Sequence, residues 1–226
     1  MSDFSRIEDS VDITLLQSIT IVIVGAGGTY SLILNLIRCG ILNITVIDFD
    51  TVEASNVCRQ GFDKGDIGSF KVDALEKAAQ RINPDVNFTG IKADFTQLKE
   101  IRLRAIFEES DLNIFGTDSF KAQAFGNLIS LKHDTPALWA GWYTGSKTGE
   151  VFFQIPGVTP ACFRCCTSSR YLANEQGEVK ASSNGNTIFH SQFLDSLIGF
   201  VALAILHHDC FSHKSLPISQ TALLAV

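Results

Sequence analysis

The chain has 226 residues, of which 46% are hydrophobic and 19% are charged, which is enough for one well-buried core and too short for two. The formal net charge of −6 and the pI near 5.3 argue against a nucleic-acid partner, because non-specific binding to DNA or RNA depends on Lys and Arg side chains that neutralise phosphates. Six cysteines are too few for a disulfide scaffold of this size and indicate thiol chemistry, metal binding or packing in a reducing compartment.

The first residues contain neither the cationic nor the apolar region of a signal peptide, so we expect a cytoplasmic location. A β-branched apolar run at 19–24 then ends at Gly25-Ala26-Gly27-Gly28, and residues 30–40 carry apolar side chains at helical spacing. This order predicts a strand, a glycine turn and a helix. A helix N-terminus offers free N–H groups, and glycines let phosphate oxygens come close to the backbone. Gly25, Gly27 and Gly28 therefore form a candidate anion site.

A second strand is expected at 44–47 and ends at Asp48, which lies 23 positions after Gly25. An acid about 20 residues after such a glycine turn binds ribose hydroxyls in dinucleotide-binding folds. However, Tyr30 occupies the sixth position of the dinucleotide fingerprint, where Gly or Ala would allow tight packing, and the Gly-Lys-Ser/Thr element of a P-loop is absent. A plain NAD site is disfavoured, and an NAD-dependent oxidoreductase stays as an alternative.

A group of polar side chains follows Asp48 directly, and it contains two cations and two amides: Asn56, Arg59, Gln60 and Lys71. A triphosphate needs such groups, because its oxygens must be held and its developing charge must be stabilised. A dinucleotide dehydrogenase has no need of that charge. The alternative interpretation is that these residues form a solvated loop.

Downstream of this group, helix and strand patterns alternate. Helices are expected at 71–82, 98–106 and 120–131, and strands at 87–91, 112–115 and 137–140. The helix at 120–131 is expected to bury Leu128 and Leu131. Alternation of this kind predicts an α/β protein with a Rossmann-like, mostly parallel sheet, helices on both faces, and ligands at the carboxyl ends of the strands. Gly25, Asp48 and Asp118 all fall at such ends.

After about residue 141 the pattern changes. A turn-rich link at 144–149 leads to a strand at 151–155 that is expected to extend the sheet antiparallel. Residues 167–186 are polar, which predicts a mobile loop that crosses over the active site. The last helix, expected at 188–207, is the most apolar segment. Its core at 193–206 is interrupted by Asp195, Ser196 and Gly199 and falls short of the ~20 residues of a membrane span. We expect a buried helix at a subunit contact, and no membrane partner.

The order Gly-x-Gly-Gly, then Asp-x-Asp-x-Val-x-x-Ser-Asn-x-x-Arg-Gln, then Lys71, Asn83-Pro84 and Thr117-Asp118, resembles the ThiF, MoeB and ubiquitin-activating family of adenylating enzymes. The resemblance covers about residues 4–207. It implies one ThiF-type adenylation domain over residues 1–226, with ATP and Mg²⁺ as cofactors. The implied reaction is adenylation of the C-terminal glycine carboxylate of a ubiquitin-like or sulfur-carrier protein, with release of pyrophosphate.

The resemblance also implies roles for individual residues. Asp48 binds the ribose, Lys71 contacts the α-phosphate region, and Asp118 positions magnesium. The remaining nucleotide-binding residues are the glycines of the turn together with Asp50, Asn56, Arg59 and Gln60, of which the last three hold the phosphates.

Phe4-Ser5-Arg6 resembles the aromatic-x-Arg element of the family, whose arginine reaches the triphosphate in the neighbouring subunit. Arg6 therefore joins Arg59, Lys71 and Asp118 as a candidate catalytic residue, and a homodimer is expected.

Cys162 and Cys165 have the spacing of half a tetrahedral zinc site. Many family members complete that site with a second Cys-x-x-Cys near the C-terminus, which this chain lacks. Cys166 and Cys210 are further potential ligands. Zinc binding and a reduced cysteine cluster both stay open.

Members of the family that transfer the acyl group to a thiol carry the nucleophile in the crossover loop, which here contains Ser182 and Ser183 and no cysteine. We therefore expect the acyl group to pass to an external acceptor, such as a conjugating or sulfur-donor protein. Cys166 is the competing nucleophile, because Arg164 lies close by in the sequence and would favour a thiolate. A non-catalytic scaffold subunit and an enzyme that adenylates a short peptide or small acid also stay open, although a scaffold subunit would be expected to lose the phosphate ligands.

Overall fold

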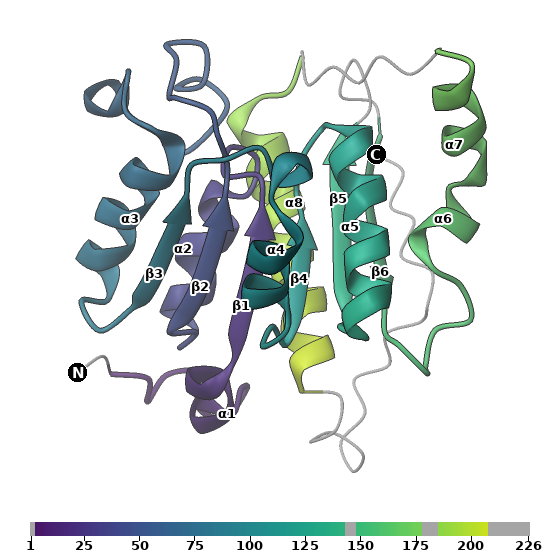
Figure 1. Cartoon of the computed structure of the whole chain (residues 1–226). Coiled ribbons are helices and arrows are strands. Elements are labelled where there is room, and N and C mark those ends of the chain that lie inside the picture. The colour runs from purple at the N-terminus through teal and green to yellow at the C-terminus, as the bar shows by residue number, and fades with distance from the viewer. Residues whose placement is uncertain (1–2, 143–147, 178–184, 208–226) are drawn as a thin grey trace.

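The computed structural model describes residues 3–142, 148–177 and 185–207. In these residues six strands form one sheet in the order β3-β2-β1-β4-β5-β6 (Figure 1). The strands are β1 (Thr20–Val24), β2 (Asn43–Ile47), β3 (Asn87–Ile91), β4 (Leu112–Phe115), β5 (Ala137–Trp142) and β6 (Gly149–Gln154). The first five are parallel, and β6 pairs antiparallel with β5. The predicted Rossmann-like sheet with an antiparallel extension is confirmed.

Helices cover both faces of this sheet (Figure 1). One face carries α2 (Tyr30–Arg38), α3 (Lys71–Ile82) and α8 (Ile188–Leu206), and the other carries α4 (Glu100–Phe107) and α5 (Phe120–His133). The short helix α6 (Phe163–Cys166) packs on α5 and β6 and leads into α7 (Ser168–Glu175). Short 3-10 turns occur at Lys64–Asp66 (η1) and Phe95–Gln97 (η2), and α1 (Ile13–Ser18) precedes β1.

The central strand β1 is buried on both faces, which explains its continuous apolar sequence. Ile21 and Ile23 belong to the core beneath α2, α3 and α8, and Val22 and Val24 belong to the core beneath α4 and α5. Successive side chains of a strand point to opposite faces of the sheet. One five-residue strand therefore joins both cores, and its carboxyl end places the glycine turn at the edge of the sheet.

The core beneath α5 is aromatic and centres on Trp139. Its ring stacks between Phe115, at a centroid distance of 5.3 Å, and Phe163, at 4.9 Å. The indole Nε1 donates a hydrogen bond to the carbonyl oxygen of Gln123, 3.0 Å away. Because Phe163 lies in α6, this stack fixes the start of the segment that follows β6.

The prediction for the buried face of α5 is wrong. Leu128 and Leu131 are 57% and 48% exposed, and the helix turns Gln123, Asn127 and Ser130 toward the protein interior. Burial of Ser130 and Gln123 is offset by hydrogen bonds: Asn113 in β4 donates to the Ser130 hydroxyl, and Gln123 donates to the Thr117 carbonyl. Partners that come from another strand decided which face of α5 points inward.

The predicted mobile loop at 167–186 is partly wrong, because residues 168–175 form α7. Tyr171 in α7 contacts the ring of Phe120 edge to face, with centroids 4.9 Å apart. Arg170 forms an ion pair with Glu150 in β6. Phe120 and Glu150 thus hold this polar segment from other parts of the fold. Its composition alone does not reveal such contacts. Residues 178–184, with Ser182 and Ser183, lie outside the described part of the chain, as does most of the turn-rich link after β5.

The last helix is helical as predicted but is not fully buried. Over its 19 residues only Leu194, Asp195, Ile198 and Ala202 are buried, on the side that packs against α2, β5 and β6. Within the described residues, α8 is the one helix that is long and apolar enough to cross a membrane by length and composition. The expectation that this segment is too short for a membrane span is therefore wrong by this criterion, which the core helix of a soluble protein also meets. Packing on the sheet accounts for the buried residues of α8 only, because Phe189, Phe193 and Phe200 are exposed.

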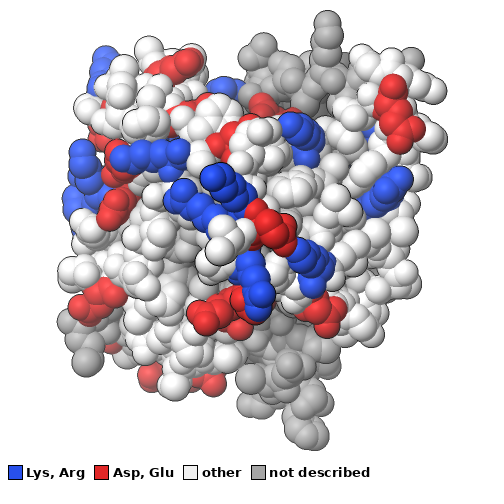
Figure 2. All heavy atoms as spheres, in the orientation of Figure 1, with Lys and Arg blue, Asp and Glu red and all other residues white. Residues whose placement is uncertain are grey.

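Folding also gathers charges that are spread along the sequence. Figure 2 shows Lys and Arg side chains collected on the face that α4 and α5 form, with Asp and Glu among them. Two surface ion pairs lie there, Arg104 with Glu108 and Lys132 with Glu100. These pairs are mostly exposed, so water and salt screen them and they contribute little to stability.

Candidate functional site

The glycine turn follows β1 directly and packs against the backbone after β4. Gly25 has a φ of +95°, and a Cβ there would lie 2.7 Å from the carbonyl oxygen of Gly116. The Gly25 amide donates to the Ile47 carbonyl, and the Gly116 amide donates to the Val24 carbonyl, both at 3.0 Å. The turn is therefore held between the carboxyl ends of β2 and β4, in a conformation that only glycine adopts without strain.

Replacing Gly25 by alanine is expected to lower the free energy of unfolding by about 2 kcal/mol or more. The left-handed conformation alone costs a residue with a Cβ about 1–2 kcal/mol, and the clash with Gly116 adds to that cost. Gly28→Ala is the matched control, because its nearest neighbour would be 3.9 Å away and its φ is not positive. Urea denaturation of both variants measures the difference, and equal losses would contradict this explanation.

Two side chains pack the loop at 53–60 onto the turn and onto α2. The Gln60 carboxamide lies so close to Gly27 that a Cβ there would be 2.6 Å from its Nε2. Tyr30 covers Gly61 and meets the Phe62 ring edge to face, at a centroid distance of 4.7 Å. Tyr30, which departs from the dinucleotide fingerprint, therefore ties the 53–60 loop to the helix that follows the turn.

Asp48 at the end of β2 joins the turn to the next segment. Its Oδ2 accepts a hydrogen bond from the Ala26 amide at 2.7 Å, and its Oδ1 accepts one from the Asp50 amide at 2.8 Å. Burial raises the pKa of this carboxyl, and these two bonds and Lys71 act in the opposite direction. A carboxylate oxygen can accept more than one hydrogen bond, so Asp48 retains acceptor capacity for a hydroxyl of a ligand.

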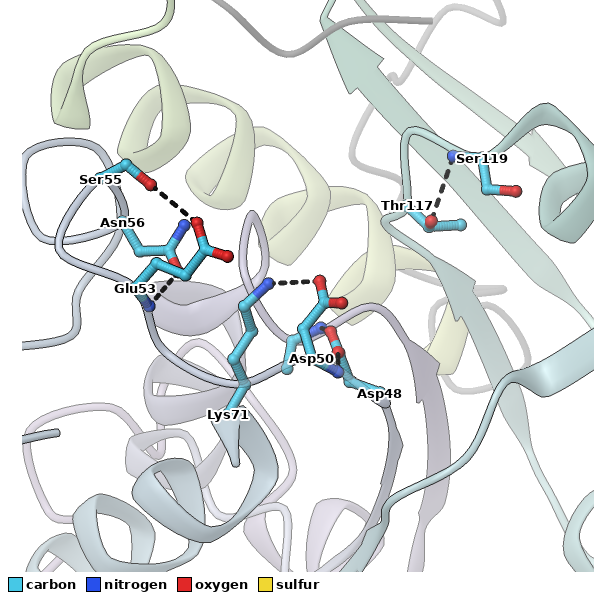
Figure 3. Close-up of polar contacts among 9 residues, drawn as sticks. Asp48, Asp50, Glu53, Ser55, Asn56, Lys71, Thr117 and Ser119 are labelled. Atoms are coloured by element: carbon cyan, nitrogen blue, oxygen red, sulfur yellow. Dashed lines mark hydrogen bonds and ion pairs between the residues drawn. The ribbon is translucent and has the colours of Figure 1, made fainter. Parts of the chain in front are cut away.

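Lys71, the first residue of α3, lies beside Asp48 and Asp50. Its amide donates to the Asp50 carbonyl at 3.0 Å, and its Nζ forms an ion pair with Asp50 Oδ2 at 2.7 Å (Figure 3). The Lys71 side chain is 9% exposed, whereas that of Asp50 is 49% exposed. A buried ammonium group with one carboxylate partner thus lies at the carboxyl edge of the sheet, next to the glycine turn.

Asn56 organises the 53–60 loop from within. Its side-chain oxygen accepts a hydrogen bond from the Glu53 amide at 2.8 Å, and its carbonyl accepts from the amides of Arg59 and Gln60. The residue is only 5% exposed. The carbonyl of Arg59 accepts a bond from the Ser191 hydroxyl in α8, 2.8 Å away. The structure therefore gives Asn56 a loop-shaping role, which residue type alone did not indicate.

Asp118 lies between β4 and α5 and is exposed. The residues beside it are fixed by local bonds: the Thr117 hydroxyl accepts from the Ser119 amide, and the Ser119 hydroxyl caps α5 by accepting from the Ala122 amide. Figure 3 shows this loop across from the segment with Asp48, Asp50 and Lys71. The structure thus brings the predicted glycines, acids and Lys71 together at one edge of the sheet.

Arg6 does not join this group. It is exposed in the turns that precede α1, and Figure 1 shows that segment at the edge where the strands begin, opposite the glycine turn. A role for Arg6 in the site of its own chain is therefore excluded by position, and a role in a second subunit stays a prediction.

Cys162, Cys165 and Cys166 lie at α6, on the far side of the sheet from α2 and α3. Cys162 Sγ and Cys165 Sγ are 3.5 Å apart. Burial acts to raise the pKa of Cys162, but hydrogen bonds from Cys165, Arg164 and Asn127 outweigh it and lower the pKa. Cys166 is exposed.

Three or more metal-binding side chains would be needed for a structural zinc site. Within residues 3–142, 148–177 and 185–207 there is no such group of His, Cys, Asp and Glu. Cys162 and Cys165 on their own do not fit zinc, and Cys210 lies outside the described residues.

One residue that contacts the helix after the glycine turn has no signal in the local sequence pattern. Asp195 in α8 is 3% exposed, and its Oδ2 accepts a hydrogen bond from the Leu32 amide in the first turn of α2, at 3.0 Å. Sequence reasoning treats Asp195 as an interruption of an apolar helix. The contact joins residues 163 positions apart, so local pattern does not reveal it.

Together, the sheet order, the glycine turn at the end of β1 and the acid at the end of β2 define an α/β protein of the Rossmann-like class. The comparisons with known proteins narrow this class. The ThiF family matches residues 3–208, and the chain belongs to that family.

Two groups of relatives illustrate this membership. SUMO-activating enzyme subunit 2 of Dictyostelium discoideum is 33% identical over 153 residues, which cover 66% of this chain and 22% of that protein. Ubiquitin-like modifier-activating enzyme 5 of Gallus gallus is 30% identical over 175 residues, which cover 72% of this chain and 43% of that protein. The chain therefore spans less than half the length of these curated relatives.

The fold is shared with solved structures. E. coli MccB, crystallised with AMPCPP and MccA, superposes with a TM-score of 0.70 at 19% identity, covering 87% of this chain and 58% of that chain. The structure of PaaA gives a TM-score of 0.69 at 17% identity, covering 86% of this chain and 66% of that chain. At these identities the likeness concerns the fold.

Proposed function

We propose that the chain catalyses ATP-dependent adenylation of a C-terminal glycine carboxylate on a ubiquitin-like protein. A carboxylate oxygen attacks the α-phosphorus of ATP, the bond from that phosphorus to the bridging oxygen breaks, and pyrophosphate leaves. The observation that carries the proposal is the buried Lys71 beside Asp48 and the glycine turn, in a member of the ThiF family. The carboxylate is already ionised at neutral pH, so no general base is needed.

The residues present fit ATP. The glycine turn leads directly into the N-terminus of α2, where backbone N–H groups favour an anion, and Asp48 has acceptor capacity for a ribose hydroxyl. Lys71 pairs with a half-exposed carboxylate, and we propose that its Nζ moves from Asp50 to an α-phosphate oxygen when ATP binds. Arg59, Gln60 and the loop that Asn56 organises face the same edge and hold the remaining phosphates.

Asp118 fits a magnesium ion that is held jointly by the protein and the nucleotide. Mg²⁺ in such sites is commonly bound by one or two carboxylates together with phosphate oxygens and water, and Asp118 is an exposed carboxylate on the loop opposite Lys71. The ion supplies charge neutralisation at the phosphates when it is bound. The role of this chain is to hold position and charge rather than to react covalently.

The choice of carrier follows from the relatives. The curated relatives named above activate SUMO or ubiquitin-like modifiers by their names, which supports a ubiquitin-like protein over a sulfur carrier. ATP–pyrophosphate exchange, measured with candidate carriers and with the same carriers lacking the last glycine, tests the proposal. We expect exchange that requires magnesium and the free glycine carboxylate. Binding of NAD without binding of ATP would overturn it, and exchange with short peptides alone would replace the carrier by a peptide.

The acyl group then passes to an external acceptor, such as a conjugating protein. Within the described residues Cys166 is exposed at the end of α6, and no contact links it to the glycine turn. A thiol-sensitive adduct on a non-reducing gel that disappears in Cys166→Ala would instead make Cys166 the nucleophile.

We also propose that the chain forms a homodimer through α8. Phe189, Phe193 and Phe200 are 77%, 46% and 74% exposed, and their spacing of four and seven residues places them on one side of the helix. In such a dimer Arg6 is free to reach the site of the neighbouring subunit.

Phe200→Asp is expected to convert the dimer into a monomer, because a charge would have to be buried in the apolar contact. Ile101→Asp is the control, since Ile101 is 79% exposed on α4, at the other face of the sheet. Sedimentation velocity at micromolar concentration with ATP present distinguishes the two states. A monomeric wild-type protein would contradict the proposal.

A further inference from the structure

Asp195 is a buried carboxylate in the most apolar helix of the chain. It is 3% exposed, and its Oδ1 has no hydrogen-bond partner in the described structure, whereas its Oδ2 accepts from the Leu32 amide at 3.0 Å. The Ser31 amide also stabilises the carboxylate. A buried charge without a full set of partners is costly, so an arrangement of this kind needs a reason.

That reason lies at the N-terminus of α2, which has no side-chain cap of its own. Thr29 occupies the cap position but makes no capping bond, because its hydroxyl donates back to the carbonyl of Gly25 within the glycine turn. The first amides of a helix have no partner inside the helix and need an acceptor. Asp195 supplies that acceptor from α8 and frees Thr29 to hold the turn.

The same stretch of α8 also holds the 53–60 loop. Ser191, one helical turn before Asp195, donates its hydroxyl proton to the Arg59 carbonyl at 2.8 Å. The first half of α8 therefore contacts both the helix that follows the glycine turn and the backbone of Arg59. These are the two segments that the proposed function assigns to the phosphates.

We propose that Asp195 is a positioning residue of the nucleotide site, which fixes the glycine turn by capping α2 from α8. The proposal rests on the function given above. Asp195 itself touches no ligand atom: it acts through the amides of Ser31 and Leu32 and through the conformation of the turn that precedes them. Removal of its charge and acceptor leaves α2 packed through its apolar face but lets the first turn and the glycines change conformation.

If Asp195 has a purely structural role, the expected results for Asp195→Leu differ from those expected if it positions the glycine turn. Leucine has a similar volume and removes a buried, incompletely paired charge, a change that often leaves stability equal or higher. We expect the midpoint of urea unfolding at pH 8 to stay at or above the wild-type value, while the Kd for MgATP rises at least tenfold. Asp195→Asn keeps an acceptor for the Leu32 amide and is expected to bind MgATP within threefold of wild type.

The measurements are calorimetric titration with MgATP in the absence of any carrier, and hydrogen exchange of the amides at 26–33. Ser196→Ala is the control, since Ser196 is the exposed neighbour on α8 whose hydroxyl bonds within its own helix. Faster exchange at 26–33 in Asp195→Leu, and not in Asp195→Asn or Ser196→Ala, supports the proposal. Unchanged exchange and unchanged Kd in Asp195→Leu overturn it.

The proposed function and the proposed role of Asp195 can be disproved independently of each other. If the wild-type protein does not bind MgATP, the proposed function is wrong, and the exchange pattern alone decides whether Asp195 fixes the turn. If Asp195→Leu does not fold, Asp195→Asn and Asp195→Ser replace it. Equal exchange at 26–33 in those two variants, although serine is too short to reach the Leu32 amide, would then overturn the proposal.

Discussion

Replacing Lys71 by alanine is expected to lower the rate of ATP–pyrophosphate exchange about a hundredfold or more. Lys71 is the buried cation at the carboxyl edge of the sheet, and removal of one preorganised group that stabilises developing charge has effects of about this size. The fold should tolerate the change, because its partner Asp50 is half-exposed and can be solvated.

Asp118→Ala is expected to reduce exchange to a similar extent, and in its case higher magnesium should restore part of the rate. Lys92→Ala is the matched control: Lys92 forms a surface ion pair with Asp73 in α3 and lies over the Phe70 ring, close to Lys71 in the fold. We expect it to retain the wild-type rate. Wild-type exchange in both Lys71→Ala and Asp118→Ala would show that the site is assigned to the wrong residues.

The free energy of unfolding is expected to fall as the pH rises from about 5 to about 8. Burial raises the pKa of Asp195 to about 7, against hydrogen bonds from the amides of Leu32 and Ser31, whereas an aspartate in the unfolded chain has a pKa of about 3.9. Between these values the folded state binds more protons than the unfolded state, so a rise in pH favours unfolding. The contribution is fully present below pH 4 and is lost as the pH passes through 7.

The size of this effect is at most about 4 kcal/mol for Asp195, from the difference between its two pKa values. Burial also raises the pKa of Glu150 to about 7, but its ion pair with Arg170 favours the charged carboxylate, so we expect Glu150 to contribute less than Asp195. Urea denaturation at pH 5, 6, 7 and 8 measures the slope. Asp195→Asn should flatten it, and Glu150→Gln should remove a smaller part. An unchanged slope in the double variant would assign the dependence to other groups.

The positions of the candidate site could be predicted because they depend on local pattern and on one rule of topology. The apolar run before Gly25 and the run before Asp48 identify two strands, and parallel strands bring their carboxyl ends to one edge. Lys71 follows from its place at the start of an amphipathic helix. The hydrogen bond from the Lys71 amide to the Asp50 carbonyl then fixes how far Lys71 lies from Asp50, which the sequence spacing does not determine.

The family motif also carried information that composition did not. The spacing of Asn56, Arg59 and Gln60 after Asp48 led to the ThiF family, which the match over residues 3–208 confirms. The roles of these residues toward ATP stay predictions. The structure shows that Asn56 and Gln60 make contacts within the protein: Asn56 accepts hydrogen bonds inside the 53–60 loop, and Gln60 packs on Gly27.

Other features could not be predicted because their cause lies outside the segment concerned. Leu128 is exposed since Asn113 and Thr117 supply partners for the polar face of α5. Residues 168–175 are helical because Phe120 and Glu150 give that polar segment something to pack on. Hydrophobic periodicity reports which residues are apolar, not which polar residues find partners.

The sequence by itself determined the order of strands and helices, the glycine turn and the acids and Lys71 at the edge of the sheet, because each depends on spacing within a short stretch of chain. The tertiary structure alone decided which faces of α5 and α8 point inward and that Asp195 caps α2. The contacts of α8 join residues more than a hundred positions apart, and those of α5 join it to β4 and to the loop after β4. A buried carboxylate is stabilised by the amides that surround it, and only the folded chain brings those amides to it.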